Sequence, residues 1–175
     1  EKNGYHMVLG KHNYVVSFAA NQMARKLGNT LVAPVIQYVP EGDPDRQGPG
    51  SISLPSPAYD QLLDAAARSL KAHGFKEILF IGDSAGTKVF ALTDYYEEGR
   101  VHYRAWMEAQ FGYEDALIGS HAGISDTSQM LYVYPAGIRA DRILPFATDL
   151  ILQFSPAMPA FDEAIRMLEV IASAV

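Results

Sequence analysis

A serine flanked by glycines is the most direct chemical signal in this chain of 175 residues. Residues 82–86 read Gly-Asp-Ser-Ala-Gly, a G-x-S-x-G pattern with Ser84 at its centre, after a short apolar run and before a helical stretch. In α/β-hydrolases this pattern forms a strained strand-to-helix turn that exposes the serine Oγ as a nucleophile. A serine esterase is therefore one function that the sequence allows.

Two features disfavour the esterase. The catalytic histidine of that fold comes last in the order serine, acid, histidine, and no histidine follows His121 in this chain. The His-Gly-Gly-Gly sequence that commonly supplies the oxyanion hole is also missing. We keep the serine esterase, with Ser84 as its nucleophile, as an alternative.

The elements that must position such residues alternate in type along the chain. Apolar residues recur at helical spacing over residues 12–27, and this predicted helix ends at Gly28. A second helix is predicted over residues 56–73, with Gly74 just after its end. We expect a third helix from about Thr87.

Two apolar runs between the helices predict strands. Residues 30–38 are rich in β-formers and favour a strand buried on both faces, and residues 77–81 form a shorter apolar run. Residues 119–126 are predicted as a polar loop and residues 159–175 as a closing helix. Strands alternating with helices indicate a three-layer α/β/α domain with a mostly parallel central sheet, in which ligands bind at the carboxyl ends of strands. We expect one domain over residues 1–175.

Composition excludes several classes of function. The net charge is -6, so nucleic acid is not an expected partner, since phosphate binding needs clustered lysine and arginine. The absence of cysteine removes disulfides, thiolate nucleophiles and cysteine zinc sites. No apolar run approaches the ~20 residues needed to cross a bilayer. The chain starts at Glu1 without a signal peptide, so we expect that an N-terminal strand and any targeting signal are missing; a cytoplasmic and a periplasmic location both suit the composition.

Four separated segments share an order and spacing with one enzyme family. They are EKNGYHMVLGKH at residues 1–12, PGSISL at residues 49–54, GDSAGT at residues 82–87 and GSHAGISDTSQML at residues 119–131. Together they resemble the signatures of the creatininase-like amidohydrolases, and the fourth is nearly complete. The resemblance covers the chain to about Arg142 and fades beyond Pro145.

The resemblance implies hydrolysis of a C–N bond in a small or cyclic amide, assisted by two divalent ions such as zinc or manganese. Carried over by position, Glu1 is a kept ligand, and His12 replaces a bridging aspartate. Asn3 and Ser84 replace two histidines, and both are weak ligands. Asp83, beside the second of these positions, is a substitute ligand if the turn shifts. We therefore predict a weakened or absent metal site made of Glu1, His12 and Asp83.

The same resemblance assigns the remaining roles. His121 matches a histidine that acts as a proton donor, and Asp126 replaces a glutamate that could orient it. Asn3, Ser84 and Trp106 are candidates for the substrate pocket. A homo-oligomer that binds a small-molecule substrate is the expected assembly. Because the ligands are eroded, a catalytically inactive small-molecule binder or an assembly subunit on the same fold is the second alternative.

Overall fold

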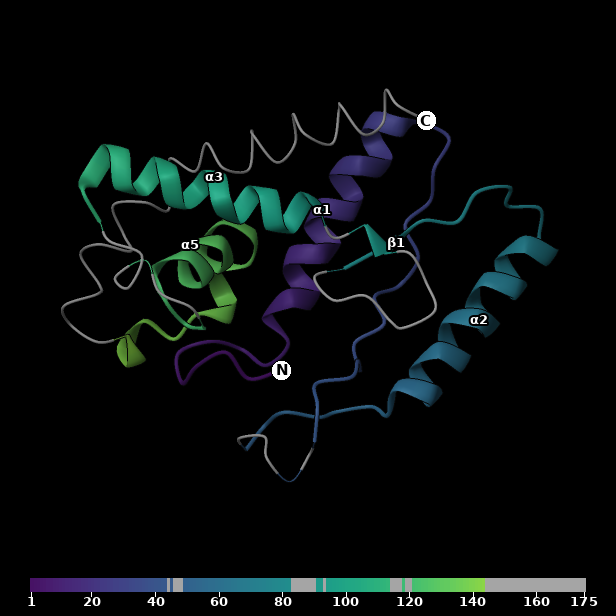
Figure 1. The fold of residues 1–175 in the computed structure, drawn as a ribbon, viewed down its shortest axis with the longest axis horizontal. Coiled ribbons are helices and arrows are strands. Elements are labelled where there is room, and N and C mark those ends of the chain that lie inside the picture. Colours follow the sequence, from purple (N-terminus) through teal and green to yellow (C-terminus); the bar gives the residue numbers. More distant parts are fainter. Residues whose placement is uncertain are drawn as a thin grey trace.

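The structure is a computed structural model, and it describes residues 1–43, 45, 49–82, 91–92, 94–113, 118 and 121–143. Its elements are α1 (Lys11–Leu27), α2 (Ser56–Ala72), β1 (Phe80–Ile81), β2 (Ala91–Leu92), α3 (Asp94–Phe111), α5 (Ile124–Val133) and the 3-10 helices η2 (Pro135–Gly137) and η3 (Ala140–Arg142). Figure 1 shows their arrangement. The predicted closing helix over residues 159–175 lies outside the described residues.

The first two helices form where the apolar spacing predicts them. α1 buries one stripe of four residues spaced four apart, Lys11, Val15, Ala19 and Met23, and its C-terminal cap is Gly28 with a φ of 64°. α2 ends at Ala72, and the following Gly74 has a φ of 92°. A left-handed glycine just past the last turn stops a helix at little steric cost, so both helices end as predicted.

The predicted strands are confirmed only in part. β1 pairs with β2 in parallel, with Phe80 opposite Ala91 and Ile81 opposite Leu92. The helix expected from about Thr87 starts in residues outside the described part; of the residues that follow, Ala91–Leu92 forms β2 and α3 begins at Asp94. Within the described residues these two strands form the single sheet, so the larger sheet of a three-layer domain stays a prediction.

The prediction of a buried strand over residues 30–38 is wrong for this structure. Leu31 is 77% exposed and Tyr38 is 55% exposed. The segment has no ladder of its own; the adjoining Val39 forms one isolated parallel bridge with Ser53. β-forming residues make a strand only when a neighbouring strand supplies hydrogen bonds and a packing face, and none of the described segments supplies one here.

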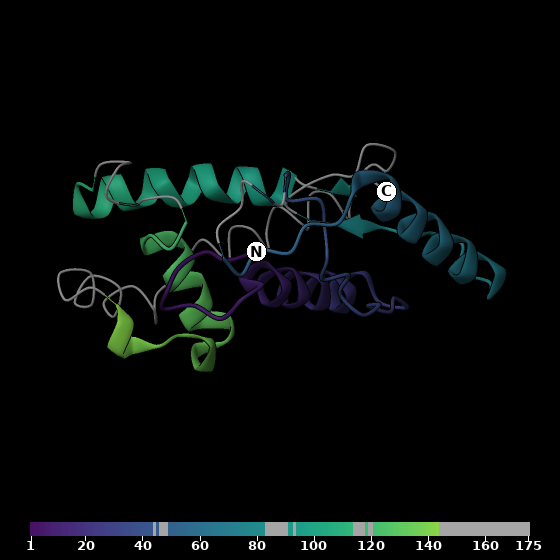
Figure 2. The same cartoon turned by 90° about the horizontal axis from the view of Figure 1, so that it is seen from below.

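Two buried clusters lie on either side of the loop before α5. In one, Met7 and Val15 pack on Met130 and thereby join the N-terminal segment and α1 to α5. In the other, Tyr103 and Met107 of α3 pack on residues near the start of α5, namely Ile118 and Ile124. Figure 2 shows α3 on one side of the molecule and α1 with α5 on the other. α5 is thus packed from two sides, through Ile124 in its first turn and Met130 further along the helix.

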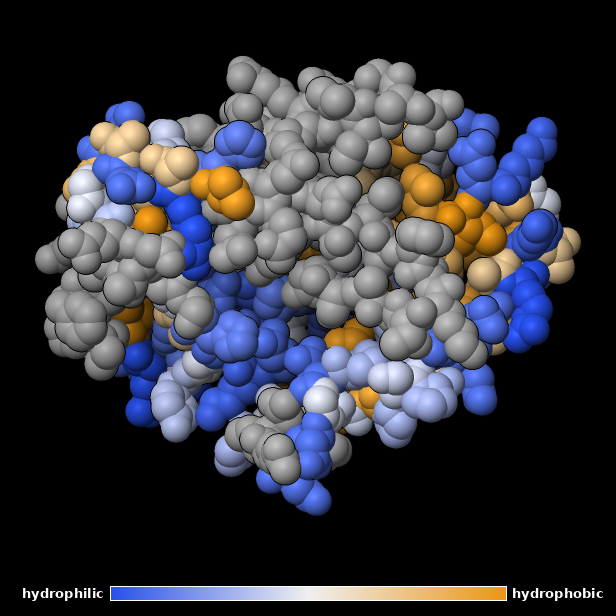
Figure 3. Space-filling view, viewed as in Figure 1, coloured by the Kyte–Doolittle hydropathy of each residue, from blue (hydrophilic) through white to orange (hydrophobic). Residues whose placement is uncertain are grey.

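The outer surface has exposed apolar side chains at the end of the molecule that carries α2 (Figure 3), where Leu62, Phe75 and Leu79 are all exposed. None of the helices in the described part combines the length and the apolar character that crossing a bilayer requires.

Candidate functional site

The candidate site lies where the N-terminal segment crosses the start of α5. This segment is anchored by the backbone: Val8 donates to the Gly137 carbonyl oxygen at 2.8 Å, and Arg139 donates to the His6 carbonyl oxygen at 2.8 Å. Met7 and Ile138 form an antiparallel bridge between the same two segments. These contacts place residues 1–6 beside the loop that starts at His121, although more than a hundred residues separate them in sequence.

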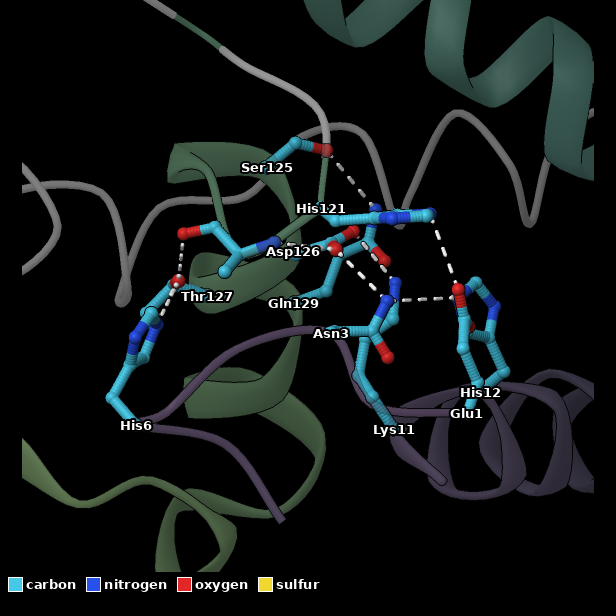
Figure 4. Close-up of polar contacts among 11 residues, drawn as sticks. Glu1, Asn3, His6, Lys11, His12, His121, Ser125, Asp126, Thr127 and Gln129 are labelled. Carbon is cyan, nitrogen blue, oxygen red and sulfur yellow. Dashed lines mark hydrogen bonds and ion pairs between the residues drawn. The ribbon is translucent and has the colours of Figure 1, made fainter. Parts of the chain in front are cut away.

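Glu1 is the centre of the site and contacts two histidines (Figure 4). Its Oε2 lies 3.1 Å from Nε2 of His12, and its Oε1 lies 3.2 Å from Nε2 of His121. The hydrogen bond from His12 lowers the pKa of the Glu1 carboxyl, against the effect of burial, and the charges of His12 and His121 lower it further. The structure therefore brings together three of the residues predicted from sequence, around a carboxylate that is ionised at neutral pH.

The three side chains differ in their access to solvent. The side chain of Glu1 is 18% exposed and that of His12 is 21% exposed, whereas His121 is 70% exposed. A molecule arriving from solvent meets the imidazole of His121 first and the Glu1 carboxylate behind it. This arrangement suits a proton donor at the mouth of the site and a base further in.

The predicted contact between Asp126 and His121 is not among the contacts of Asp126 in the described structure. Its Oδ1 lies 2.6 Å from Nζ of Lys11 in a buried ion pair. Its Oδ2 accepts a hydrogen bond from the backbone N–H of Ala122 at 3.1 Å and a longer one from the amide of Asn3 at 3.4 Å. The physical reason is burial: a carboxylate inside the protein needs a cation and several donors, and Lys11 supplies the cation.

Lys11 is the site residue that the sequence analysis missed, and a signal for it was present. It is fully buried and begins the stripe of α1 that continues through Val15, Ala19 and Met23. A lysine at an apolar position of an amphipathic helix is almost never buried without a partner of opposite charge. The buried partner here is Asp126.

Asn3 lies between His12, which contacts Glu1, and the buried Asp126. Its side-chain nitrogen lies 3.4 Å from Asp126 and 3.5 Å from Nε2 of His12. Asn3 is 5% exposed, and its oxygen Oδ1 is buried with no hydrogen-bond partner among the described residues. Asn3 Oδ1 is thus a buried acceptor enclosed by the protein beside the site.

His6 and the loop before α5 hold the two segments at close range. Nε2 of His6 lies 2.9 Å from Oγ1 of Thr127, and burial, followed by the nearby Arg139, lowers the pKa of His6. Ala122 has a φ of 60°, and a Cβ on Gly4 would lie 2.5 Å from the Ala122 Cβ. Only a glycine at position 4 permits this approach of the two chains.

The other predicted site residues lie elsewhere or outside the described part. Trp106 is half-buried on α3, where it contacts Phe111 edge-on at 5.5 Å and packs on the cluster around Tyr103. Its place in a substrate pocket stays a prediction. Asp83 and Ser84 lie outside the described residues, so the metal role of the first and the nucleophile role of the second stay predictions too.

The described part of the chain contains only some of the ligands that the resemblance implies for a two-metal centre. Within the described residues, no three His, Asp or Glu side chains are grouped so that they could hold one ion. The Glu1 oxygens are turned toward imidazole nitrogens, and Asn3 offers an amide where a stronger nitrogen ligand would be needed. A buried cation is present in the ammonium of Lys11, which pairs with Asp126.

Comparison with known proteins assigns the fold. The Creatininase family model, described as creatinine amidohydrolase, matches residues 1–166. A crystal structure of creatinine amidohydrolase (creatininase) is similar with a TM-score of 0.60 and 21% identity, over 82% of this chain and 65% of that chain. This chain therefore spans slightly less than two thirds of that relative.

Two further solved structures align along nearly the whole chain. A structure named "Creatininase Mn" gives a TM-score of 0.66 at 19% identity, over 99% of this chain and 85% of the other. A mutant creatininase complexed with creatine gives 0.61 at 19% identity, over 99% and 86%. No curated protein is significantly similar to the chain. At these identities the likeness establishes the creatininase fold.

Proposed function

Because the chain belongs to the creatininase family, we propose that it is an amidohydrolase that cleaves the C–N bond of a small or cyclic amide with weakened metal dependence. One observation supports this most: the Glu1 carboxylate contacts the imidazoles of both His12 and His121, with His121 toward solvent. A base beside an exposed proton donor is the pair of groups that amide hydrolysis needs.

In this mechanism Glu1 is the general base. Its lowered pKa keeps it ionised, and His12 holds the carboxylate in place through the contact at 3.1 Å. Glu1 takes a proton from a water molecule as the water oxygen forms a bond to the amide carbon. The amide C–N bond then breaks.

His121 is the proton donor to the leaving nitrogen. Its Nε2 faces the same carboxylate at 3.2 Å, so the proton that Glu1 has gained can pass to His121 and restore both groups. A positioned acid or base of this kind is typically worth 10²–10⁴-fold in rate.

Weakened metal dependence follows from the ligands. Asn3 and His12 occupy positions where the resemblance implies a histidine and an aspartate, and an amide is a weaker metal ligand than an imidazole. A structure in the same fold group is named for Mn, so zinc or manganese at Glu1, His12 and Asp83 is the ion to test. Glu1, His12 and Asp83 would hold such an ion, which would supply polarisation of the amide carbonyl.

The test is turnover of creatinine and of other cyclic amides by the purified protein, with and without added manganese or zinc. A neighbour in this fold is complexed with creatine, which makes creatinine the first substrate to try. We expect His121→Ala to lower kcat by roughly 10²-fold. His73→Ala is the matched control, because His73 is exposed at the end of α2 and its ring bonds the Ser69 carbonyl oxygen of the same helix.

Turnover by no cyclic amide under either metal condition would contradict the proposal. Binding of creatinine without turnover, measured by calorimetry, would favour the inactive binder instead. Turnover that survives in His121→Ala would leave the family assignment intact but would remove His121 as the proton donor.

We also propose that the protein forms a homo-oligomer, as the resemblance implies. The exposed side chains of Leu62, Phe75 and Leu79 support this, since apolar surface of this kind is commonly covered by a partner. Sedimentation of a single species at the monomer mass over a wide concentration range would contradict it.

A further inference from the structure

The buried ion pair between Lys11 and Asp126 lies directly beneath the loop that presents His121. Lys11 is fully buried, and its Nζ lies 2.6 Å from Oδ1 of Asp126. Neither residue touches Glu1, His12 or His121 in the contacts described for the two of them. The pair therefore takes no direct part in the proposed chemistry.

The second carboxylate oxygen of Asp126 links the ion pair to the loop before α5. Oδ2 accepts the backbone N–H of Ala122 at 3.1 Å. Ala122 immediately follows His121 and has a φ of 60°, a left-handed conformation that alanine adopts only when its surroundings impose it. The carboxylate of Asp126 is thus the group that fixes the turn on which the His121 side chain depends.

The other contacts of the loop constrain its orientation less than the bond to Asp126 does. The Cβ of Ala122 packs tightly against Gly4, and Oγ1 of Thr127 lies 3.3 Å from the Ala122 carbonyl oxygen. Packing limits the position of the loop, whereas a charge-assisted bond from a carboxylate to an N–H also sets its orientation. His121 is mostly exposed, so little packing of its own side chain can orient it.

We propose that Lys11 is a positioning residue for His121. Its ammonium holds the Asp126 carboxylate under the Ala122 N–H, and the resulting left-handed turn aims Nε2 of His121 at Glu1. The expected effect on catalysis rests on the proposed function, but the effect on the position of His121 does not.

The double variant Lys11→Met/Asp126→Leu tests this role. Replacing a buried ion pair by apolar residues of similar volume is often neutral or stabilising, so we expect the double variant to fold with a Tm at or above that of the wild type. It nevertheless lacks the carboxylate that binds the Ala122 N–H. If the ion pair contributed to stability alone, this variant would keep the position of His121 unchanged.

The readout is the rate at which diethyl pyrocarbonate modifies His121, followed by peptide mass spectrometry. Release of Nε2 from Glu1 should raise this rate by about 3-fold or more, and Glu1→Gln gives the rate of a released His121. His73, exposed at the end of α2, serves as the internal control whose rate should not change. With creatinine as substrate, kcat should fall by roughly 10-fold while KM stays within about 2-fold.

A folded double variant with an unchanged rate at His121 would overturn the proposal. A faster rate at His121 in a protein that hydrolyses no amide would support the positioning role and reject the proposed function, so the two failures are separable. If the double variant does not fold, hydrogen exchange at the Ala122 amide of the wild type decides. Exchange slowed by about 100-fold or more supports the bond to Asp126, and exchange at the rate of an unstructured peptide rejects the proposal.

Discussion

Gly4 is the position at which the close approach of the two site segments can be measured most directly. A Cβ built on Gly4 would lie 2.5 Å from the Cβ of Ala122, where ordinary contacts are 3.4–4 Å. The Ala122 Cβ is fixed to the backbone and cannot rotate away, so Gly4→Ala must move one segment. Overpacking of this kind typically costs about 1–3 kcal/mol, and we expect Gly4→Ala to destabilise the protein by that amount.

Ala122→Gly provides the matched background for this prediction. It removes the clashing Cβ and also relieves the left-handed alanine, a gain of roughly 1–2 kcal/mol that is offset by about 0.5–1 kcal/mol of glycine entropy. The single variant Ala122→Gly should therefore lie within about 1 kcal/mol of the wild type. In that background Gly4→Ala should cost less than about 0.5 kcal/mol, because the atom it meets is gone.

The assay is urea unfolding of the wild type, the two single variants and the double variant, analysed as a double-mutant cycle with equal m values. The coupling between positions 4 and 122 should exceed about 1 kcal/mol. The reasoning is refuted if Gly4→Ala has the same cost, to within about 0.3 kcal/mol, in both backgrounds. Position 4 would then have room for a Cβ, and the close approach could not explain the glycine.

Further predictions concern pH, metal and Ser84. Burial lowers the pKa of His6 from 6.5, so the folded state binds fewer protons than the unfolded state. The contribution of His6 to the free energy of unfolding is therefore complete above pH 6.5 and is lost as the pH falls through the folded pKa. His6→Gln should make the free energy of unfolding, measured with urea from about pH 7.5 to 5, depend less on pH. After dialysis, elemental analysis should find less than about one divalent ion per chain; about two would contradict the weak site. The triple variant Asn3→His/His12→Asp/Ser84→His should bind zinc at least ~10-fold more tightly, and an unchanged affinity would show that these positions do not converge. A fluorophosphonate should leave Ser84 unlabelled, whereas a stoichiometric adduct would favour the esterase.

The sequence predicts the helices better than the strands, for a physical reason. The spacing of apolar residues in α1 and the glycines that follow α1 and α2 are local signals, and both helices end within one residue of their predicted ends. A strand depends on a partner that local sequence does not specify. Residues 30–38 have the composition of a buried strand, yet Leu31 and Tyr38 are exposed, because no described segment pairs with them.

The candidate site was predictable where a motif names the residue and its place, as for Glu1, His12 and His121. It was not predictable where a residue outside the motif's functional positions forms an ion pair with a site residue, as Lys11 does with Asp126. Lys11 was overlooked because it precedes His12 in a signature that draws attention to His12 alone. The apolar stripe of α1, which Lys11 begins, is the independent pattern that indicates its burial and hence an acidic partner.

Asp126 shows why position in a motif and position in a helix must both be considered. The motif places this residue five positions after His121, which suggests a carboxylate that orients the imidazole. The helix places it in the first turn of α5, where a carboxylate reaches back to unpaired backbone N–H groups and is stabilised by the helix dipole. Asp126 does reach back toward the start of α5, but the N–H that it accepts is that of Ala122, one residue before the N-cap Gly123. A carboxylate used in this way has one oxygen left for a cation, and Lys11 of the facing helix occupies it. His121 is consequently left to pair with Glu1, so the anchoring of the loop before α5 and the assembly of the candidate site depend on the same carboxylate.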